Sequence, residues 1–421
     1  MLTWKLLGFF LFNALLLNGV LLLTSPPGFN ETVLKHTQDT LNARNLYDDS
    51  WGAMGQALDY LQSPHKTSVY TEVFFRLGRK FQYPVSSLLP FAAVRSYLDL
   101  VSIGFLLLTI LATAGLLEVL LRESGMISHV GGTVIGRAAL VAAFSLTFYP
   151  IVKAFTLGQI QVWINALFAV SLLCWVTDRR ASAGILIGLI SLIKPHYGLF
   201  LLWAGLRREW RFAVTVTATC LVGLAVSVAT FGWANHVDYL RVLTFLSQHG
   251  ESFHPNQSVN GLLNRLMGIH YPNLYDNVRS DLYFPPYSPW VYAGTLISSI
   301  AILLPALFKR RSEADPGRVF DFCIVAVSCT IASPIAWEHH YGILLPVFVV
   351  VFTSALQDRS RMIWVAVSYV LASNYFQIAN LLAPTILNVV QSYLFAAAVI
   401  VLVLLYRTPE ENAARTGTPI A

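Results

Sequence analysis

The sequence predicts an all-α polytopic membrane protein, with about ten full spans, one short-helix hairpin and two long outer loops. Three observations lead to this prediction. Of the 421 residues, 56% are hydrophobic and only 12% are charged, whereas soluble domains carry about a quarter charged residues. The mean hydropathy is +0.60. The apolar residues are gathered in runs of roughly 20, the length that crosses the hydrocarbon core of a bilayer.

Ten apolar runs are predicted to be spans within one integral membrane domain, 1–421. The first run could be a signal peptide, but its length suits a full span and no clear small-residue cleavage site follows, so we expect an uncleaved helix. The runs are 4–24, 99–121, 136–153, 157–177, 212–232, 291–308, 319–336, 341–356, 362–380 and 386–406.

Basic residues in the short loops predict the orientation, because Lys and Arg gather on the cytoplasmic side. The formal net charge of +6 therefore signals topology and not nucleic-acid binding. The N-terminus and the tail 407–421 are then cytoplasmic, and 25–95 and 233–290 are outer loops of a plasma (inner) membrane protein. The residues that set this orientation are Arg122, Arg137, Arg179, Arg180, Arg207, Arg208, Arg211, Lys309, Arg310, Arg311, Arg359 and Arg361.

One segment, "DRRASAGILIGLISLIKPHYGLFLLWAGLRREWR", has basic clusters at both ends. A single crossing would place one cluster on the wrong side. Lys194 precedes Pro195 in its middle, and proline breaks a helix because it lacks a donor and clashes with the preceding turn. We therefore predict a hairpin of two short helices, 181–193 and 196–206, with Lys194 at a tip that faces the outside or a cavity open to it.

The polar residues of the predicted outer face gather into one candidate site. Ionisable groups at membrane depth are functional candidates by default. Each also has a structural alternative: solvated loop acids, a snorkelling lysine, or asparagines that cap and join helices. The four cysteines lie in apolar runs and read as core residues. The candidates are Asp48, Asp49, Gln159, Gln161, Lys194, His196, His254, Asn256, Asn260, Asn264, Glu338, His339 and His340.

Two finer expectations concern how these residues are arranged. Asn256, Asn260 and Asn264 recur every four residues and are expected to share a helix face. His339 and His340 would point about 100° apart on a helix, so joint binding of one metal ion is not expected. "DDSWGAMGQALDYL" has apolar residues at helical spacing, which predicts an amphipathic helix in the first outer loop.

This set of side chains suits the transfer of a sugar from a lipid phosphate. The reaction needs a base to take a proton from an acceptor hydroxyl. It also needs cations or donors that stabilise the charge of the departing phosphate. Two other classes stay open at this point: a lipid-linked sugar flippase or transporter, and a non-catalytic membrane scaffold.

Four segments in order resemble glycosyltransferase family 87, over about residues 45–350: "TLGQIQVWINALF", "AGILIGLISLIKPHYGLFLLW", "NQSVNGLLNRLM" and "SPIAWEHHYGILLP". The family includes polyprenyl-phosphate-mannose-dependent mannosyltransferases and looks like GT-C enzymes, so the resemblance implies a GT-C-like bundle with a catalytic acid in the first outer loop. That acid falls on the "DDSW" stretch, as Asp49 or Asp48. The histidine of the family's Trp-acid-His-His motif falls on His339 or His340, and Glu338 stands where relatives often have Asp.

The resulting hypothesis is an enzyme that transfers a sugar, most plausibly mannose, by single inverting displacement on the outer face. Asp49, or else Asp48, is the expected base. The donor is a polyprenyl-phosphate sugar, the acceptor is a lipid or glycan, and neither an obligatory metal cofactor nor nucleic acid is expected. The residues expected to bind phosphate or sugar hydroxyls, or to order the loops around them, are Lys194, His196, His339, His340, Glu338, Gln159, Asn256 and Asn260.

Overall fold

The computed structural model describes residues 2–24, 31–43, 48–64, 66–268, 284–309 and 317–407. Throughout these ranges the chain is helical without a β-strand, and an isolated antiparallel bridge joins Asn256 to Trp337. The predicted all-α class is therefore confirmed. Arg310, Arg311 and nearly all of the predicted tail 407–421 lie outside the described residues, as do residues 269–283 of the second predicted outer loop.

The helices fall into two groups. Those of the bundle are α1 (Leu2–Leu11), η1 (Phe12–Leu17), α2 (Asn18–Leu23), α6 (Leu98–Glu123), α7 (Ile127–Val130), α8 (Val134–Leu146), α9 (Tyr149–Thr156), α10 (Gln161–Val176), α11 (Arg180–Ile193), η5 (Pro195–Gly198), α12 (Leu199–Arg207), α13 (Trp210–Phe231), α16 (Pro289–Phe308), α17 (Gly317–Ile331), η7 (Glu338–Ile343), α18 (Leu344–Ala355), α19 (Arg359–Ser373), η8 (Gln377–Leu382), η9 (Ile386–Ser392) and α20 (Tyr393–Tyr406). Those of the two predicted outer loops and their ends are α3 (Val33–Leu41), α4 (Asp49–Gln62), η2 (Tyr70–Arg76), η3 (Val85–Ser87), α5 (Leu88–Val94), η4 (Arg95–Tyr97), α14 (Trp233–His249) and α15 (Val259–Leu266).

Several of these helices have the length and composition of membrane spans, so the polytopic prediction is also confirmed. Among the described residues, five helical stretches qualify, and a sixth if the bent pair α8 and α9 is one span. Three further apolar helices are shorter, which leaves the predicted number of about ten spans a prediction. The qualifying stretches are Val85–Glu123, Trp210–Phe231, Pro289–Phe308, Glu338–Ala355 and Ile386–Tyr406.

The predicted span 136–153 differs from the structure, which divides it into α8 and α9 with a bend of 63°. The break falls at Thr147 and Phe148, directly before the Tyr149–Pro150 start of α9. Pro150 has no N–H to donate, so it fits the first turn of a new helix better than the interior of a long one. The bend matters because α9 then runs toward the candidate site.

The predicted hairpin is confirmed. α11 ends at Ile193, Lys194 is extended (φ −129°, ψ 95°), and η5 and α12 lead back. The two basic ends return to the same end of the bundle: Arg180 approaches Glu209 at 3.9 Å, while Arg207 at the end of α12 pairs with Asp321 at 2.6 Å. Arg318, three residues before Asp321, pairs with Glu209 at 2.5 Å. Lys194 therefore lies at the opposite end from these arginines.

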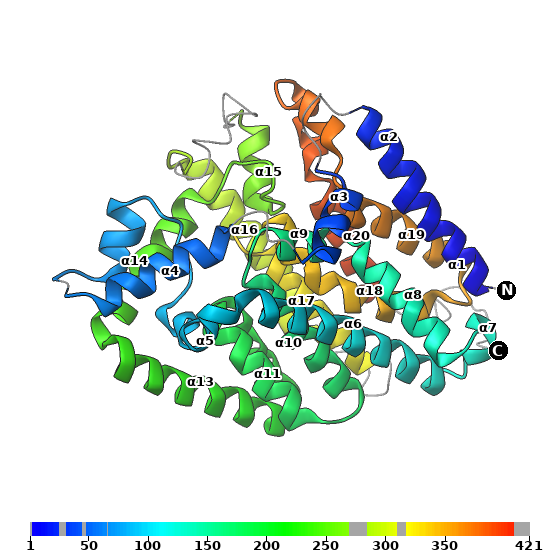
Figure 1. The fold of residues 1–421 in the computed structure, drawn as a ribbon, viewed down its shortest axis with the longest axis horizontal. Helices are drawn as coiled ribbons and strands as arrows, with labels where there is room; N and C mark the ends of the chain where they lie inside the picture. The colour runs from blue at the N-terminus through cyan, green and yellow to red at the C-terminus, as the bar shows by residue number, and fades with distance from the viewer. Residues whose placement is uncertain are drawn as a thin grey trace.

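The outer-loop helix predicted from "DDSWGAMGQALDYL" is α4, and its apolar side chains Trp51, Met54 and Leu58 are buried as that pattern predicts. In Figure 1, α4 and α14 lie at one end of the molecule, and α1 and α7 lie at the other. α13 runs along one edge beside α11. Gly184 and Gly188 of α11 leave no room for a side chain against α13, a close approach of the kind that small residues allow between membrane helices.

Candidate functional site

The start of α4 is joined by hydrogen bonds to the turn between α9 and α10. The backbone N–H of Asp49 donates to the carbonyl of Leu157 at 3.0 Å, and the N–H of Trp51 donates to Gly158 at 3.3 Å. The Ser50 hydroxyl donates to the Gly158 carbonyl and accepts from the N–H of Ile160 at 2.7 Å. Because these bonds come from Asp49 itself and from the two residues that follow it, they hold its backbone beside the first turn of α10.

The structure distinguishes the two aspartates that the sequence left as alternatives. Both are exposed, but the Asp49 carboxylate accepts a hydrogen bond from Nε2 of Gln159. Gln159 is 5% exposed, and its Oε1 accepts from the Tyr83 hydroxyl at 3.1 Å. The Asp48 side chain instead lies over Gly52 of α4. Asp49 is therefore the aspartate whose carboxylate is oriented by a hydrogen bond from Gln159.

Lys194 is a buried lysine whose hydrogen-bond partner is a neutral amide. It is 7% exposed, and its Nζ donates to Oε1 of Gln161 at 2.7 Å. In the described part of the chain no carboxylate lies within ion-pair distance of it. The Lys194 charge is close enough to interact with the imidazoles of His196, His339 and His340. The hairpin tip and the histidine pair, which are distant in sequence, therefore lie in one cluster, in which the lysine amine and the imidazole N–H groups can donate to an anion.

The two histidines of η7 have different surroundings. The backbone N–H of Trp337 donates to Nδ1 of His340 at 3.3 Å. His339 is buried, its ring stacks on Trp337 with centroids 6.2 Å apart, and it makes no hydrogen bond within the described ranges. His339 thus keeps both ring nitrogens for a ligand, while one ring nitrogen of His340 is already used.

Asn256 holds the loop that leads into η7. Its Oδ1 accepts from the N–H of Ala336 at 2.9 Å, and its Nδ2 donates to the carbonyls of Glu251 at 2.7 Å and Pro334 at 3.1 Å. The N–H of Glu338 donates to Pro255 next to it, at 3.0 Å. All three side-chain bonds go to backbone groups, so the geometry favours the loop-ordering role for Asn256.

Asn260 also bonds within the protein, to both backbone and side chain: its Oδ1 accepts from the N–H of Glu251 at 3.1 Å, and its Nδ2 donates to the Thr295 hydroxyl at 3.2 Å. The expectation that Asn256 and Asn260 share a helix face is wrong, because Asn256 lies before α15. Ser258 caps that helix by accepting from the N–H of Gly261 at 3.2 Å. A serine cap is a strong local start signal that a four-residue spacing does not reveal.

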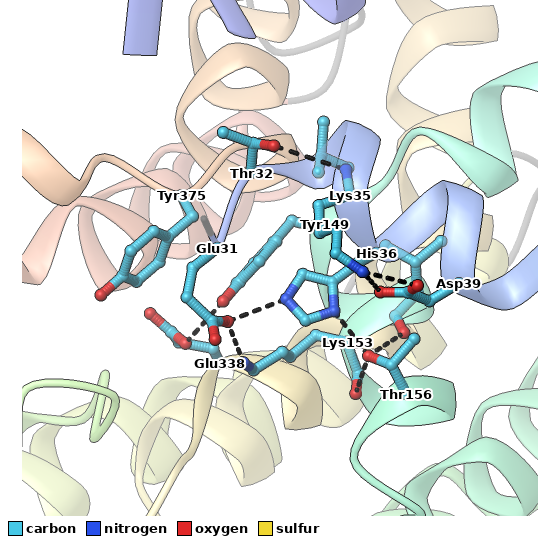
Figure 2. Close-up of polar contacts among 12 residues, drawn as sticks. Glu31, Thr32, Lys35, His36, Asp39, Tyr149, Lys153, Thr156, Glu338 and Tyr375 are labelled. Atoms are coloured by element: carbon cyan, nitrogen blue, oxygen red, sulfur yellow. Dashed lines mark hydrogen bonds and ion pairs between the residues drawn. The ribbon is translucent and has the colours of Figure 1, made fainter. Parts of the chain in front are cut away.

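A second polar network, which the sequence reading did not identify, lies on the other side of Glu338 (Figure 2). Lys153 of α9 pairs with the Glu31 carboxylate, which also accepts from Nε2 of His36 at 2.8 Å. Tyr149 donates to Glu338 at 3.4 Å. Burial would raise the pKa of Glu31, but the Lys153 ammonium and the His36 imidazole hold it at about 2. The network therefore ties the first outer loop to α9 and, through Tyr149, to η7.

This network leads to a prediction on stability. Glu31→Gln should destabilise the protein by about 3 kcal/mol at neutral pH, because one pKa unit corresponds to about 1.4 kcal/mol. The lowered pKa makes this stabilisation fully present above the unfolded pKa of 4.5, and it is lost as the pH falls toward 2. Thermal unfolding of both proteins against pH tests this: the gap should close below pH 4.5. Glu72→Gln, at an exposed pair with Arg76, is the control and should show almost no gap.

Comparison with known protein families matches residues 81–334, more than half of the chain, to glycosyltransferase family 87. The chain belongs to glycosyltransferase family 87. The matched stretch contains Gln159, Lys194, Asn256 and Asn260. Asp49 and His339 lie outside it, so their place in the site depends on the geometry described above.

The chain is also similar to named members of the family. A polyprenol-phosphate-mannose-dependent alpha-(1-2)-phosphatidylinositol mannoside mannosyltransferase of Mycolicibacterium smegmatis is 28% identical over 232 residues, 54% of this chain and 49% of that protein. A protein of the same name from Mycobacterium tuberculosis is 27% identical over 214 residues, 50% of this chain and 45% of that protein. A pentamannoside mannosyltransferase of the latter species is 27% identical over 291 residues, 66% of this chain and 60% of that protein. The chain thus spans about half the length of the first two relatives.

Proposed function

We propose that this protein is a membrane glycosyltransferase that transfers mannose from a polyprenyl-phosphate donor to a hydroxyl of a lipid acceptor. The observation that carries the proposal is that one turn of chain, Leu157–Gln161, makes hydrogen bonds both to a carboxylate and to a lysine amine. Gln159 contacts the exposed carboxylate of Asp49, and Gln161 contacts the amine of Lys194, which pairs with no carboxylate of the described residues. Sugar transfer from a phosphate needs both a base and a cation near the reacting atoms.

The proposed reaction is a single displacement. Asp49 takes the proton of the acceptor hydroxyl as that oxygen forms a bond to the anomeric carbon. The bond from this carbon to the phosphate oxygen breaks, its electron pair leaves with the polyprenyl phosphate, and the configuration inverts. Lys194 and His339 stabilise the charge that develops on the departing phosphate, where a preorganised cation lowers the barrier. The relatives are named as polyprenol-phosphate-mannose-dependent enzymes, which supports the choice of a polyprenyl-phosphate donor.

We place the site on the outer face of the membrane. Lys194 lies at the opposite end of α11 from Arg180, and Arg180, Arg207 and Arg318 meet at one end of the bundle. An arginine-rich end is typical of the cytoplasmic side. The apolar helices around the site would give the polyprenyl chain a path into the bilayer.

The decisive experiment is a transfer assay with the purified protein in lipid vesicles, using labelled polyprenyl-phosphate-mannose and a phosphatidylinositol mannoside acceptor. A labelled, extended acceptor supports the enzyme. Movement of labelled donor across the vesicle membrane without transfer would instead indicate a flippase. Neither transfer nor movement, with the protein folded, would indicate a scaffold.

The cluster of Lys194 and the histidines also predicts that no metal ion is needed. Activity should change less than twofold after dialysis against EDTA, because the Lys194 ammonium and the imidazole N–H donors would stabilise the phosphate charge in place of a metal. Restoration of a lost activity by Mg²⁺ or Mn²⁺ would contradict this part of the proposal. A metal-dependent glycosyltransferase assayed in the same buffers is the control.

A further inference from the structure

Gln159 and Gln161 stand two residues apart at the start of α10, and a third side chain orients each amide. The Tyr83 hydroxyl donates to Oε1 of Gln159, which turns Nε2 toward the carboxylate of Asp49. Nε2 of Gln161 donates to Oδ1 of Asn165 at 2.9 Å, which turns Oε1 toward Nζ of Lys194. The two amides therefore present opposite ends, a donor to the acid and an acceptor to the cation.

The surroundings leave these amides little freedom. Gln159 is 5% exposed and Gln161 is 1% exposed. Asn165 packs so closely on Gly342 of η7 that a side chain at position 342 would collide with its amide. The turn is also bonded to the start of α4 through Leu157 and Gly158. α4, α10, the hairpin tip and η7 are thus joined around one rigid turn.

We propose that Gln159 and Gln161 are positioning residues, which hold the base Asp49 and the phosphate-binding Lys194 at a fixed separation and leave the charge of each available because both amides are neutral. This inference rests on the proposed function. It adds a reason why these two positions carry amides and not acids. Most buried lysines are paired with a carboxylate, and a carboxylate at position 161 would satisfy Lys194 while making it useless to a phosphate.

The same substitution at the two positions then has different consequences. Gln161→Glu places a carboxylate 2.7 Å from an ammonium, as judged from the present Oε1 position. The new ion pair competes with the donor phosphate for Lys194. Gln159→Glu places a second carboxylate against Asp49, and two carboxylates that share a site hold a proton more tightly than one. Asp49 would then be protonated, and inactive as a base, up to a higher pH.

Steady-state kinetics with polyprenyl-phosphate-mannose as the varied substrate test the inference. Gln161→Glu should raise the donor KM by about tenfold or more, equivalent to losing one charged contact, without raising the acceptor KM or lowering the melting temperature. Gln161→Met, which removes the hydrogen bond and adds no charge, is the matched control and should have a smaller effect. Equal donor KM values for the two variants would overturn the role of charge at position 161.

The pH profile of the transfer rate tests the positioning role of Gln159. Gln159→Glu should shift the acidic limb of the rate profile upward by about one pH unit or more, with activity recovering as the pH rises. A role in folding alone would lower activity at every pH and leave the limb in place, and that result would overturn the inference. Wild-type protein without transfer activity would refute the proposed function itself. Active wild type with unshifted variants would refute only the positioning roles.

Discussion

Asp49→Asn is expected to lower the rate of mannose transfer by about 10²- to 10⁴-fold, the range that a general base contributes. Asparagine keeps the size of the side chain but cannot accept the proton of the acceptor hydroxyl. The melting temperature should change little, because Asp49 is exposed and the hydrogen bonds that hold the start of α4 come from the backbone. These are the bonds from Asp49 to Leu157 and from Trp51 to Gly158, and neither involves the carboxylate. Initial rates with labelled polyprenyl-phosphate-mannose give the measurement.

Asp48→Asn is the matched control for this experiment. Its side chain lies over Gly52 and, among the described residues, makes no hydrogen bond to the turn before α10, so its loss should cost less than about tenfold, or roughly 1.4 kcal/mol. The opposite ranking would reassign the base to Asp48. Wild-type rates in both variants would mean that neither aspartate is the base.

Lys194→Met is expected to separate activity from stability. Transfer should fall by about 10²- to 10³-fold, the usual cost of removing one group that stabilises a transition-state anion. The melting temperature should stay unchanged or rise, because an ammonium that is 7% exposed and bonded to an amide oxygen is costly to bury. Methionine fills nearly the same volume without a charge. An active variant would exclude Lys194 from the phosphate site.

Lys80→Met gives the contrasting control. Lys80 pairs at 2.7 Å with Glu251, which is fully buried. Removing this partner leaves a buried carboxylate without compensation, so this variant should lose about 3–5 kcal/mol of stability. Burial already raises the pKa of Glu251, which fits a carboxylate that depends on its lysine. The same substitution is therefore expected to lower the melting temperature at Lys80 but not at Lys194.

Family membership and geometry support different parts of the proposed site. The family match covers Lys194 and Gln159 but ends before η7 and begins after α4. The proposed base and the candidate histidine come from outside it, and contacts connect them to the site: Asp49 through Gln159, and His339 through its electrostatic interaction with Lys194. The variants of Asp49 and Lys194 therefore test separate lines of evidence.

Some features of the site were predictable because they depend on residues close together in the sequence. The helix break at Lys194 follows from Pro195, whose ring cannot continue the helix, and from the basic residues at both ends of the segment. The membrane class follows from the apolar runs. The α4 helix follows from the spacing of Trp51, Met54 and Leu58. Each of these signals operates over a few residues, so the rest of the fold does not need to be known.

The network of Glu31, His36 and Lys153 was not predictable in this way. Glu31 is not among the candidate residues of the sequence analysis, and Lys153 is the last residue of the predicted span 136–153. A lysine inside an apolar run was the one available signal, since such a residue needs a partner. The partner, Glu31, is more than a hundred residues away in the chain, and local patterns carry no information on that pairing.

By itself, the sequence determined that this protein is a helical membrane protein with a hairpin tip at Lys194 and a set of polar residues near it. Only the tertiary structure decided which contacts those residues make. Gln159 donates a hydrogen bond to Asp49 and not to Asp48, and Lys194 donates to a neutral amide. The side-chain bonds of Asn256 go to backbone groups. Hydrophobicity and helix breaking act along the chain and can be read from it. Hydrogen bonds and charge compensation depend on which distant residues meet, and packing determines those meetings.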